Sequence, residues 1–290
     1  MAEGKKYVQA ASLYVCGTPI GNLDDMSFRA IQVLKEVDLI AAEDTRRTIK
    51  LLNHFEIKNR LESYHEHNED EKAEKLLELL QEGQAIALVS DAGMPGISDP
   101  GYKLVKKAVE YGIEVIPVPG PTAAISALVV SGLDTGRFVF EGFLNRKGKA
   151  RREQLDKLKS EERTIILYES PYRVKETLKD LERVMGDRRI ALVRELTKVH
   201  EEKYYGNIST VLSRLEEKEI KGEVVIVLEG NQDGEETGPP PWEGLELEEH
   251  VRLLMAEGLG KKEAIKRVAE IRGIPRREVY KEAINIDIGK

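Results

Sequence analysis

The sequence predicts an α/β protein made of two α/β domains and a small helical extension. Over residues 1–132, short apolar runs alternate with segments of helical periodicity, which is typical of an open parallel sheet. Over residues 133–230, strand-like runs become more frequent than helical ones. A proline- and glycine-rich stretch, residues 231–244, then separates these domains from three short helical patterns in residues 245–290, so we expect a linker there.

In the first domain the strand-like runs occupy residues 12–17, 38–44, 85–90 and 113–118. Helical patterns occupy residues 27–37, 45–55, 71–83, 101–112 and 121–132. Asp99 followed by Pro100 predicts the start of the fourth helix, because aspartate is a preferred N-cap and proline suits the first helical position. A succession of β-α units predicts a largely parallel sheet with helices on both faces.

The second domain contains five strand-like runs, at residues 137–143, 163–170, 188–196, 201–207 and 223–230, with three helical stretches between them. Because two of these runs are adjacent near residues 190–207, we expect an antiparallel pair and therefore a mixed sheet. The extension reads as helices over residues 247–258, 261–273 and 276–285, the size of a helix-turn-helix unit. Trp242 is expected to anchor the linker.

Composition limits the possible functions. No apolar run has the form of a signal peptide or approaches the ~18 residues that a membrane span needs, so we expect a cytoplasmic protein that does not bind membranes. The one cysteine, Cys16, lies in an apolar run and is expected to be a core residue. A net charge of −7 argues against a uniformly basic nucleic-acid-binding protein.

Two basic clusters contrast with this acidic average. Residues 260–281 hold eight lysines or arginines against three glutamates, and the segment NRKGKARR holds five basic residues. Either cluster alone is compatible with a solvated face. Two such clusters in one acidic protein favour a polyanionic partner.

Four loops that follow apolar strands carry the chemistry: CGTPIGNL, AAEDTRRT, SDAGMPGISDPG and VPGPTAAISA. In open parallel sheets, ligands bind where the carboxyl ends of strands meet such loops. None has the glycine spacing of a dinucleotide fold or the lysine of a phosphate-binding loop. Carboxylates at Glu43, Asp44, Asp91 and Asp99 would repel phosphate. The loops therefore suit a cation or a neutral group. A cofactor with positive charge and no phosphate, such as the sulfonium of S-adenosylmethionine, fits them better than a nucleotide phosphate.

The segments TPIGNL, AEDTR, SDAGMPGISDPG, PGPTAAISAL, YESPYR and RELTK together resemble the signature segments of one family, the small-subunit ribosomal RNA methyltransferases I. The resemblance runs in unbroken order from about Ser12 to Gly230. It implies the tetrapyrrole methylase fold, in which two α/β domains hold S-adenosylmethionine between them, usually in a homodimer. It also implies methylation of a cytidine ribose 2′-oxygen in 16S rRNA, free or in the small subunit, with the helical extension binding RNA.

Residue by residue, the resemblance implies a set of cofactor contacts from both domains. Met94 stands where this family more often has threonine, so a side-chain hydrogen bond is lost there while backbone contacts remain. The implied cofactor-binding residues are Pro19, Ala92, Gly93, Met94, Ile97, Thr122, Ala123, Tyr168, Glu169 and Leu196.

Asp44 is the first candidate for the group that accepts the proton of the ribose hydroxyl, because it ends a strand and matches a carboxylate proposed as base in related enzymes. Alternatively it caps the helix that begins at Thr45. His65 is expected to assist proton transfer or to bind RNA. A metal site formed with His67 has little support, because no further histidine or cysteine lies close by in the sequence.

Arginines and lysines at the loops and in both basic clusters are candidates for phosphate contacts, and surface ion pairs are the alternative for each. These candidates are Arg46, Arg47, Lys198, Arg151, Arg152, Lys261, Lys262, Arg276 and Arg277.

Three functions remain open from the residues. An RNA ribose methyltransferase explains the cofactor loops together with the basic clusters. A methyltransferase acting on a small tetrapyrrole needs the same loops without the basic extension. A non-enzymatic helix-turn-helix regulator would use the extension to bind DNA. The length of the motif agreement favours the first function.

Overall fold

The computed structural model describes residues 6–216, 218–232, 242, 244–256, 259–283 and 286. The chain divides into two compact units, Met1–Gln232 and Asp233–Lys290. The first unit contains both five-stranded sheets, and the second contains the helical extension. The predicted linker, residues 231–244, lies mostly outside the described residues.

The first sheet has the order β3-β2-β4-β1-β5, and every neighbouring pair in it is parallel. Four of its strands confirm the prediction, whereas β3 was missed, because it is a half-buried edge strand of three residues without an apolar run. The strands are β1 (Ser12–Cys16), β2 (Leu39–Ala42), β3 (Leu61–Ser63), β4 (Ile86–Val89) and β5 (Glu114–Val118).

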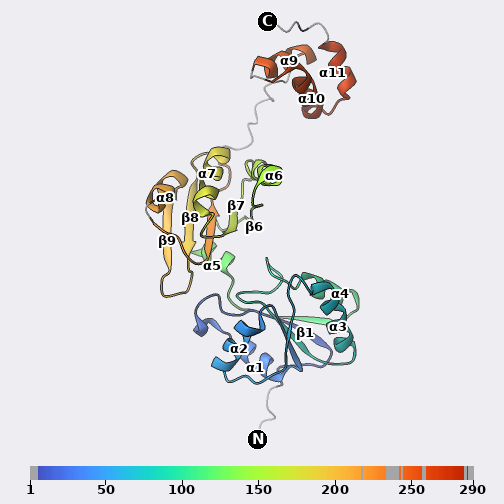
Figure 1. Cartoon of the computed structure of the whole chain (residues 1–290), viewed down its shortest axis with the longest axis vertical. Coiled ribbons are helices and arrows are strands. Elements are labelled where there is room, and N and C mark those ends of the chain that lie inside the picture. The colour runs from blue at the N-terminus through green and yellow to red at the C-terminus, as the bar shows by residue number, and fades with distance from the viewer. Residues whose placement is uncertain are drawn as a thin grey trace. The chain divides into compact units, whose positions relative to one another are not determined.

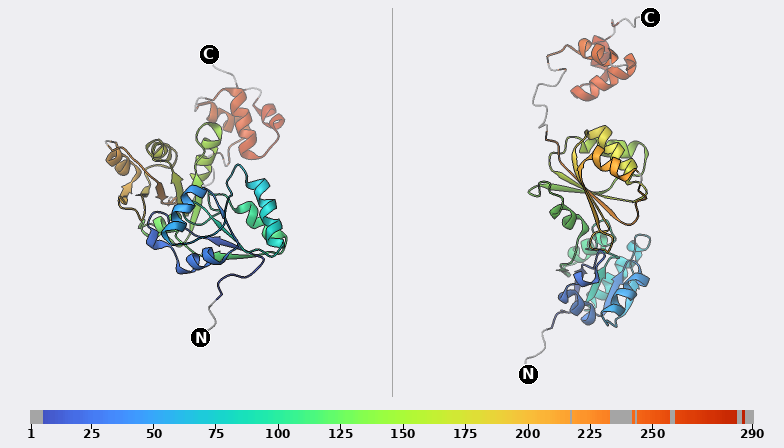
Figure 2. Two further views of the ribbon diagram at one scale, coloured as in Figure 1. Left: turned by 60° about the horizontal axis from the view of Figure 1, so that its bottom comes forward. Right: turned by 90° about the vertical axis from the view of Figure 1, so that its left-hand side faces the viewer.

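Two layers of helices cover this sheet (Figures 1 and 2). One layer packs on Tyr14 and Ile40, and the opposite layer packs on Leu13 and Leu88. Successive side chains of a strand point to opposite faces of the sheet, so each strand contributes residues to both cores. The first layer is α1 (Phe28–Glu36) and α2 (Thr45–His54), and the second is α3 (Glu69–Gln81) and α4 (Tyr102–Glu110). A short 3-10 helix, η1 (Leu23–Asp25), precedes α1. Cys16 is buried in the first core, as predicted.

The second sheet is mixed, with the order β6-β7-β10-β8-β9. Strands β6 and β7 are parallel and the other pairs are antiparallel, including the predicted pair β8 and β9. The strands are β6 (Phe138–Phe143), β7 (Thr164–Glu169), β8 (Arg189–Arg194), β9 (Glu202–Asn207) and β10 (Val224–Leu228).

Helices also cover both faces of the second sheet (Figure 2, right). One face packs against α6 (Gly148–Leu158), α7 (Val174–Met185) and α8 (Ile208–Leu215). The other face packs against α5 (Ala123–Val129) through Ala124, Ala127 and Leu128. Helix α5 follows the last strand of the first sheet, so it carries the chain from one sheet directly onto the other.

The predicted start of α4 was wrong. The helix begins at Tyr102 with Gly101 as its N-cap, and Asp99 belongs to the preceding loop. Gly101 has φ 145°, and a Cβ there would lie 3.0 Å from Leu88 Cδ2, so only glycine suits this position. The loop is therefore longer than the sequence implied, and the Asp99 side chain is not engaged in capping.

The second unit is a three-helix cluster of α9 (Leu247–Ala256), α10 (Lys261–Arg272) and α11 (Arg276–Glu282), as predicted. Its core contains Val251, Ile265 and Val268. Trp242 stacks on His250 at 5.7 Å, and Arg272 donates to the Trp242 carbonyl at 3.1 Å, so this tryptophan anchors its segment to the helices.

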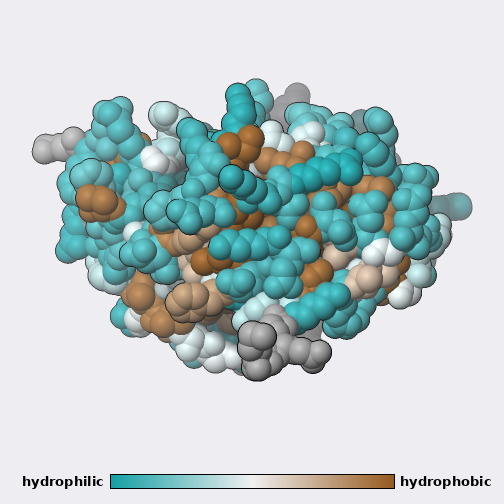
Figure 3. Space-filling view, turned by 90° about the horizontal axis from the view of Figure 1, so that it is seen from below, coloured by the Kyte–Doolittle hydropathy of each residue, from teal (hydrophilic) through white to brown (hydrophobic). Residues whose placement is uncertain are grey.

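Among the described helices, none is long and apolar enough to cross a membrane. On the face of the molecule shown in Figure 3, hydrophilic side chains predominate and hydrophobic ones show between them in smaller groups.

Candidate functional site

The loops after β1, β4 and β5 meet at the carboxyl edge of the first sheet. Thr18 and Gly93 exchange backbone hydrogen bonds of 2.9 and 3.0 Å, which ties the first loop to the third. Gly17 approaches Gly120 so closely that a Cβ on Gly17 would lie 2.7 Å from the Gly120 Cα atom. These contacts fix three backbone segments against one another and form one wall of a cavity.

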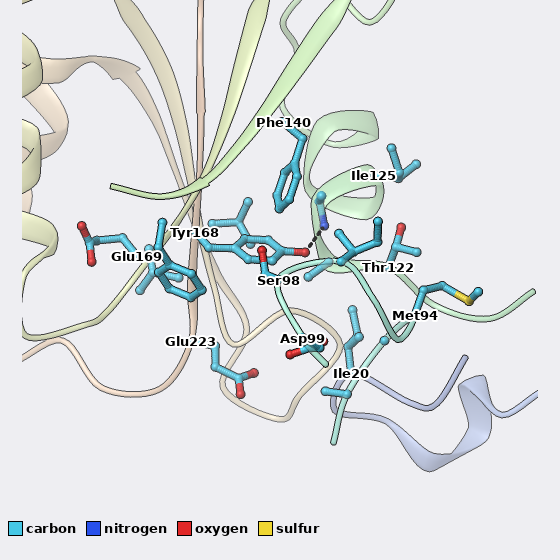
Figure 4. A pocket seen from close by; sticks show the side chains of 18 of the residues that line it. Ile20, Met94, Ser98, Asp99, Thr122, Ile125, Phe140, Tyr168, Glu169 and Glu223 are labelled. Atoms are coloured by element: carbon cyan, nitrogen blue, oxygen red, sulfur yellow. Dashed lines mark hydrogen bonds between the residues drawn. The ribbon is translucent and has the colours of Figure 1, made fainter. Parts of the chain in front are cut away.

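The cavity has a volume of about 500 Å³ and is lined from both α/β domains (Figure 4). Its volume is within the range of small-molecule sites. From the first domain and α5 it is lined by Ile20, Ala92, Gly93, Met94, Ile97, Ser98, Asp99, Thr122, Ala123, Ala124 and Ile125. From the second domain it is lined by Phe138, Phe140, Phe143, Tyr168, Glu169, Ser170, Pro171, Gly222, Glu223, Val224 and Val225.

Aromatic rings make the wall contributed by the second domain. The Tyr168 ring lies 4.9 Å from that of Phe140 and 5.7 Å from that of Phe143, both in edge-to-face geometry. The Ala124 amide donates to the Tyr168 hydroxyl at 3.2 Å, the hydrogen bond drawn in Figure 4. This bond joins β7 to the start of α5 and holds the Tyr168 ring in place.

The charged side chains among the described lining residues are all acidic: Asp99, Glu169 and Glu223. Glu169 faces away from the other two in Figure 4. Its buried carboxylate accepts hydrogen bonds of 2.6 Å from Arg173 Nη2 and from the Thr177 hydroxyl. The negative charge of Glu169 is thus neutralised inside the second domain. Glu223 pairs with Lys198 at 3.0 Å, so Asp99 is the one carboxylate among the described lining residues that has no cationic partner.

Asp99 has the most perturbed acidity in the cavity. Burial is the main cause that raises its pKa to about 7, and repulsion from Glu43, Asp91 and Glu223 adds to it. The preceding residue, Ser98, also lines the cavity and has φ 60°, a conformation that residues other than glycine rarely adopt. A carboxyl group with this pKa changes its protonation state near neutral pH, and its carboxylate is a stronger base than that of an ordinary aspartate.

Most of the predicted cofactor residues line this one cavity. They are Ala92, Gly93, Met94, Ile97, Thr122, Ala123, Tyr168 and Glu169. Pro19 and Leu196 do not line it. Ile20 takes the place expected for Pro19, and Leu196 packs against the core beneath α5.

Sequence reasoning missed the phenylalanines of β6 and the segment Gly222–Val225. Their apolar patterns predict strands at residues 137–143 and 223–230 and give no indication of ligand contact. The one sequence signal for this wall was the three phenylalanines of RFVFEGF. Phe138 and Phe140 lie at alternate positions of the strand, and Phe143 follows the bulge between Phe140 and Gly142.

Asp44 lies outside the cavity and caps α2, which confirms the alternative given for it. Its side chain accepts from the Arg46 amide at 2.9 Å and pairs with the Arg46 guanidinium at 2.8 Å. Hydrogen bonds from Arg46 lower the Asp44 pKa to about 2, which makes it a weak base. Arg47 pairs with Asp91 at 3.0 Å. Both arginines therefore have carboxylate partners.

His65 follows the edge strand β3 and does not line the cavity. Its Nδ1 atom is buried without a hydrogen-bond partner, and its ring centre lies 6.0 Å from that of His67. Within the described part of the chain, no group of three or more histidine, cysteine, aspartate or glutamate residues is placed to hold a metal ion.

The predicted phosphate-binding residues have different surroundings. For Arg151 the prediction is wrong, since it is buried and bound to Asp180 at 2.8 Å, whereas Arg152 is exposed. Lys198 pairs with Glu195 at 2.7 Å and with Glu223 at 3.0 Å. In the second unit Lys261 donates to a backbone carbonyl, and the exposed candidates are Lys262, Arg276 and Arg277.

Residues 12–212 match the family model of the Tetrapyrrole (Corrin/Porphyrin) Methylases. Solved structures agree on the fold. A diphthine synthase superposes with a TM-score of 0.60 at 15% identity, covering 75% of this chain and 89% of that one. A uroporphyrin-III C-methyltransferase from Thermus thermophilus, complexed with S-adenyl homocysteine, superposes with a TM-score of 0.55 at 19% identity, covering 75% and 97%. The chain therefore belongs to the tetrapyrrole methylases.

Several curated relatives are much more similar and carry one name, ribosomal RNA small subunit methyltransferase I. The protein of Halalkalibacterium halodurans is 51% identical, with 93% of each chain covered. That of Bacillus subtilis is 49% identical, with 92% of each covered, and that of Escherichia coli O157:H7 is 48% identical, with 94% of each covered. Within the tetrapyrrole methylases, this chain is a member of their family.

Proposed function

We propose that this protein transfers a methyl group from S-adenosylmethionine to the ribose 2′-hydroxyl of a cytidine in 16S rRNA. The observation that carries the proposal is a rigid cavity whose charged lining is acidic, in a chain about half identical to relatives named ribosomal RNA small subunit methyltransferase I. The relatives' name supports the ribosomal RNA acceptor. The residue motifs of the sequence support the cytidine and the ribose oxygen.

The residues of the cavity fit S-adenosylmethionine. The aromatic and apolar wall of Phe140, Tyr168 and Ala123 offers a surface for an adenine ring. Asp99, once ionised, favours a cationic ligand, and no described lysine or arginine lines the cavity to attract phosphate. When bound, S-adenosylmethionine supplies an electrophilic methyl group on its sulfonium.

The protein's own residues position the reactants and accept a proton. Two walls from different domains hold the cavity open and exclude bulk water, which aligns the reacting atoms for an in-line displacement. Asp99 accepts the proton of the ribose hydroxyl, because it faces the cavity and has a carboxylate pKa of about 7. A cationic ligand beside it lowers that pKa and favours the ionised form. Asp44 lies outside the cavity, and its lowered pKa makes it a weak base, so we assign it the role of helix cap and not of proton acceptor.

We further propose that the protein acts as a homodimer on 16S rRNA or on the assembled small subunit. Support for a protein interface comes from helix α5, whose outer side exposes Ile125 and Val129, the latter to 70%. Tyr205 of β9 donates to the Val130 carbonyl beside them and extends this apolar surface. The sedimentation velocity of the purified protein tests the dimer.

A methyl-acceptor assay tests the function. The protein is incubated with labelled S-adenosylmethionine and one of three acceptors: small ribosomal subunits, naked 16S rRNA or a tetrapyrrole precursor. Label in either RNA acceptor, removed by ribonuclease, is the expected result. Label in the tetrapyrrole alone would overturn the proposal in favour of a small-molecule methyltransferase of the same fold.

A further inference from the structure

A second cavity adjoins the first at the end of β6. It has a volume of about 680 Å³ and is lined by Phe143, Leu144, Asn145, Arg146, Ser170 and Arg173. Phe143 and Ser170 line both cavities, so the two share a wall. A molecule in the second cavity is therefore next to one in the first.

The sign of the charge reverses between the two cavities. The charged residues among those described that line the first are acidic, whereas those of the second, Arg146 and Arg173, are basic. Arg173 is held by Glu169 at 2.6 Å. Within the described residues, Arg146 and its neighbour Lys147 have no carboxylate within ion-pair distance, while Lys149 pairs with Glu153 at 3.3 Å. The first cavity therefore favours a cationic ligand, and the second favours an anionic one.

The rim of the second cavity is held by hydrogen bonds from the buried Arg151 and the half-buried Gln154. Arg151 Nη1 donates to the Asn145 carbonyl at 3.0 Å, and the Gln154 side chain accepts from both the Asn145 amide and its Nδ2 group, at 2.9 and 3.0 Å. Gln154 in turn donates to Glu141 at 2.7 Å. Arg151, expected from the sequence to contact RNA, instead holds the loop that carries Arg146. A loop ordered in advance loses little entropy on binding.

One aromatic side chain lines this cavity, and a second lies between two of its lining residues in the chain. Phe143 is 53% exposed although it lines both cavities, and Tyr172, in the turn between Ser170 and Arg173, is 90% exposed. Proteins that bind single-stranded nucleic acid combine cations that track the backbone with aromatic rings on which bases stack. The second cavity provides both within one short stretch of the surface.

We propose that the second cavity binds the nucleotide next to the methylated ribose in single-stranded RNA, with Arg146 on its phosphate and Tyr172 against its base. The inference rests on the proposed function and adds to it the path of the substrate. RNA bound there lies against the wall shared with the cofactor cavity, and the target ribose extends past Phe143.

The test measures RNA binding apart from methyl transfer. A labelled single-stranded RNA of about 15 nucleotides with a central cytidine is titrated in fluorescence anisotropy against the wild type, Arg146→Ala and Lys157→Ala. Lys157, exposed in the last turn of α6, the helix that follows Arg146 in the chain, is the matched control. We expect Arg146→Ala to weaken binding roughly 10-fold at low salt and to reduce the slope of log affinity against log salt by about 1. Lys157→Ala should match the wild type.

A stacking readout tests the aromatic part independently. With 2-aminopurine next to the cytidine, the wild type and Tyr172→Phe should change the fluorescence alike, and Tyr172→Ala should abolish the change, since a phenyl ring stacks as well as a phenol. Binding of S-adenosylmethionine, measured by calorimetry, should be unchanged in all these variants. If the wild type methylates RNA but Arg146→Ala and Lys157→Ala have equal RNA affinity and salt slope, the proposed role of the second cavity is overturned and the proposed function stands. A wild type that methylates no RNA would overturn the proposed function as well.

Discussion

Replacing Asp99 by asparagine removes the one carboxyl group in the cavity that is suited to accept a proton, while nearly preserving its shape. Loss of a general base lowers kcat by about 10²-fold or more. Binding of S-adenosylmethionine is expected to weaken by less, because Glu223 remains in the cavity. Asp44→Asn is the matched control. Asparagine caps a helix as well as aspartate does, so we expect this variant to keep its activity within about threefold.

The dependence on pH follows from the raised pKa of Asp99. The group must be ionised to accept a proton, so kcat/KM for S-adenosylmethionine, which reports the enzyme without that ligand, should rise with pH through about 7. The midpoint of kcat should lie lower, because the bound cation favours the ionised carboxylate. Both midpoints should vanish in Asp99→Asn.

The same group affects stability. Because its pKa is higher in the folded state than the ordinary 3.8, the folded protein loses stability as pH rises from about 4 to 7. Three units correspond to at most about 4 kcal/mol, reduced by the partial solvent exposure of the side chain. Asp99→Asn lacks this loss, so urea unfolding should show it more stable than the wild type at pH 8, with a smaller difference at pH 4.

For the catalytic prediction, an Asp99→Asn variant with the kcat and the pH profile of the wild type would refute the role of Asp99 as proton acceptor.

Three further outcomes are expected. Arg151→Ala should lower the free energy of unfolding in urea by about 2–3 kcal/mol, because it removes a buried guanidinium that donates to Asp180, the Asn145 carbonyl and the Thr177 hydroxyl. Arg152→Ala should change it by less than about 0.5 kcal/mol, and equal effects would contradict the buried role of Arg151. Gly17→Ala should weaken binding of S-adenosylmethionine in calorimetry, since its Cβ would lie 2.7 Å from the Gly120 Cα atom, and unchanged affinity would show that the loops need not touch. Burial raises the pKa of the Cys16 thiol to about 12, so a thiol reagent should react with it only after denaturation; rapid reaction of the native protein would contradict its burial.

Much of the fold could be predicted because the signals are local. Apolar runs bounded by turns fix four strands of the first sheet and all five of the second, and the adjacent runs at β8 and β9 reveal an antiparallel pair. Strand β3 was not predicted, because its three half-buried residues form no apolar run. The start of α4 escaped because a glycine at φ 145° caps the helix where aspartate and proline had been expected to do so.

The site was predictable to the extent that its motifs are contiguous. The loop from Ala92 to Ile97 and the start of α5 line the cavity as expected. Apart from Tyr168 and Glu169, the opposite wall could not be predicted from the sequence, because Phe140 and Glu223 come together there through the pairing of strands distant in the chain. The same limit explains Arg151: a basic run predicts surface charge, and only the packed structure reveals that one of its members is buried against Asp180.

The most direct test of the account is the identity of the methylated atom. Ribosomal RNA treated with the protein and isotopically labelled S-adenosylmethionine is digested to nucleosides and analysed by mass spectrometry. The account predicts label in 2′-O-methylcytidine, formed about 10²-fold more slowly when Asp99→Asn replaces the wild type. Label on a base ring, or in no nucleoside at all, would contradict it.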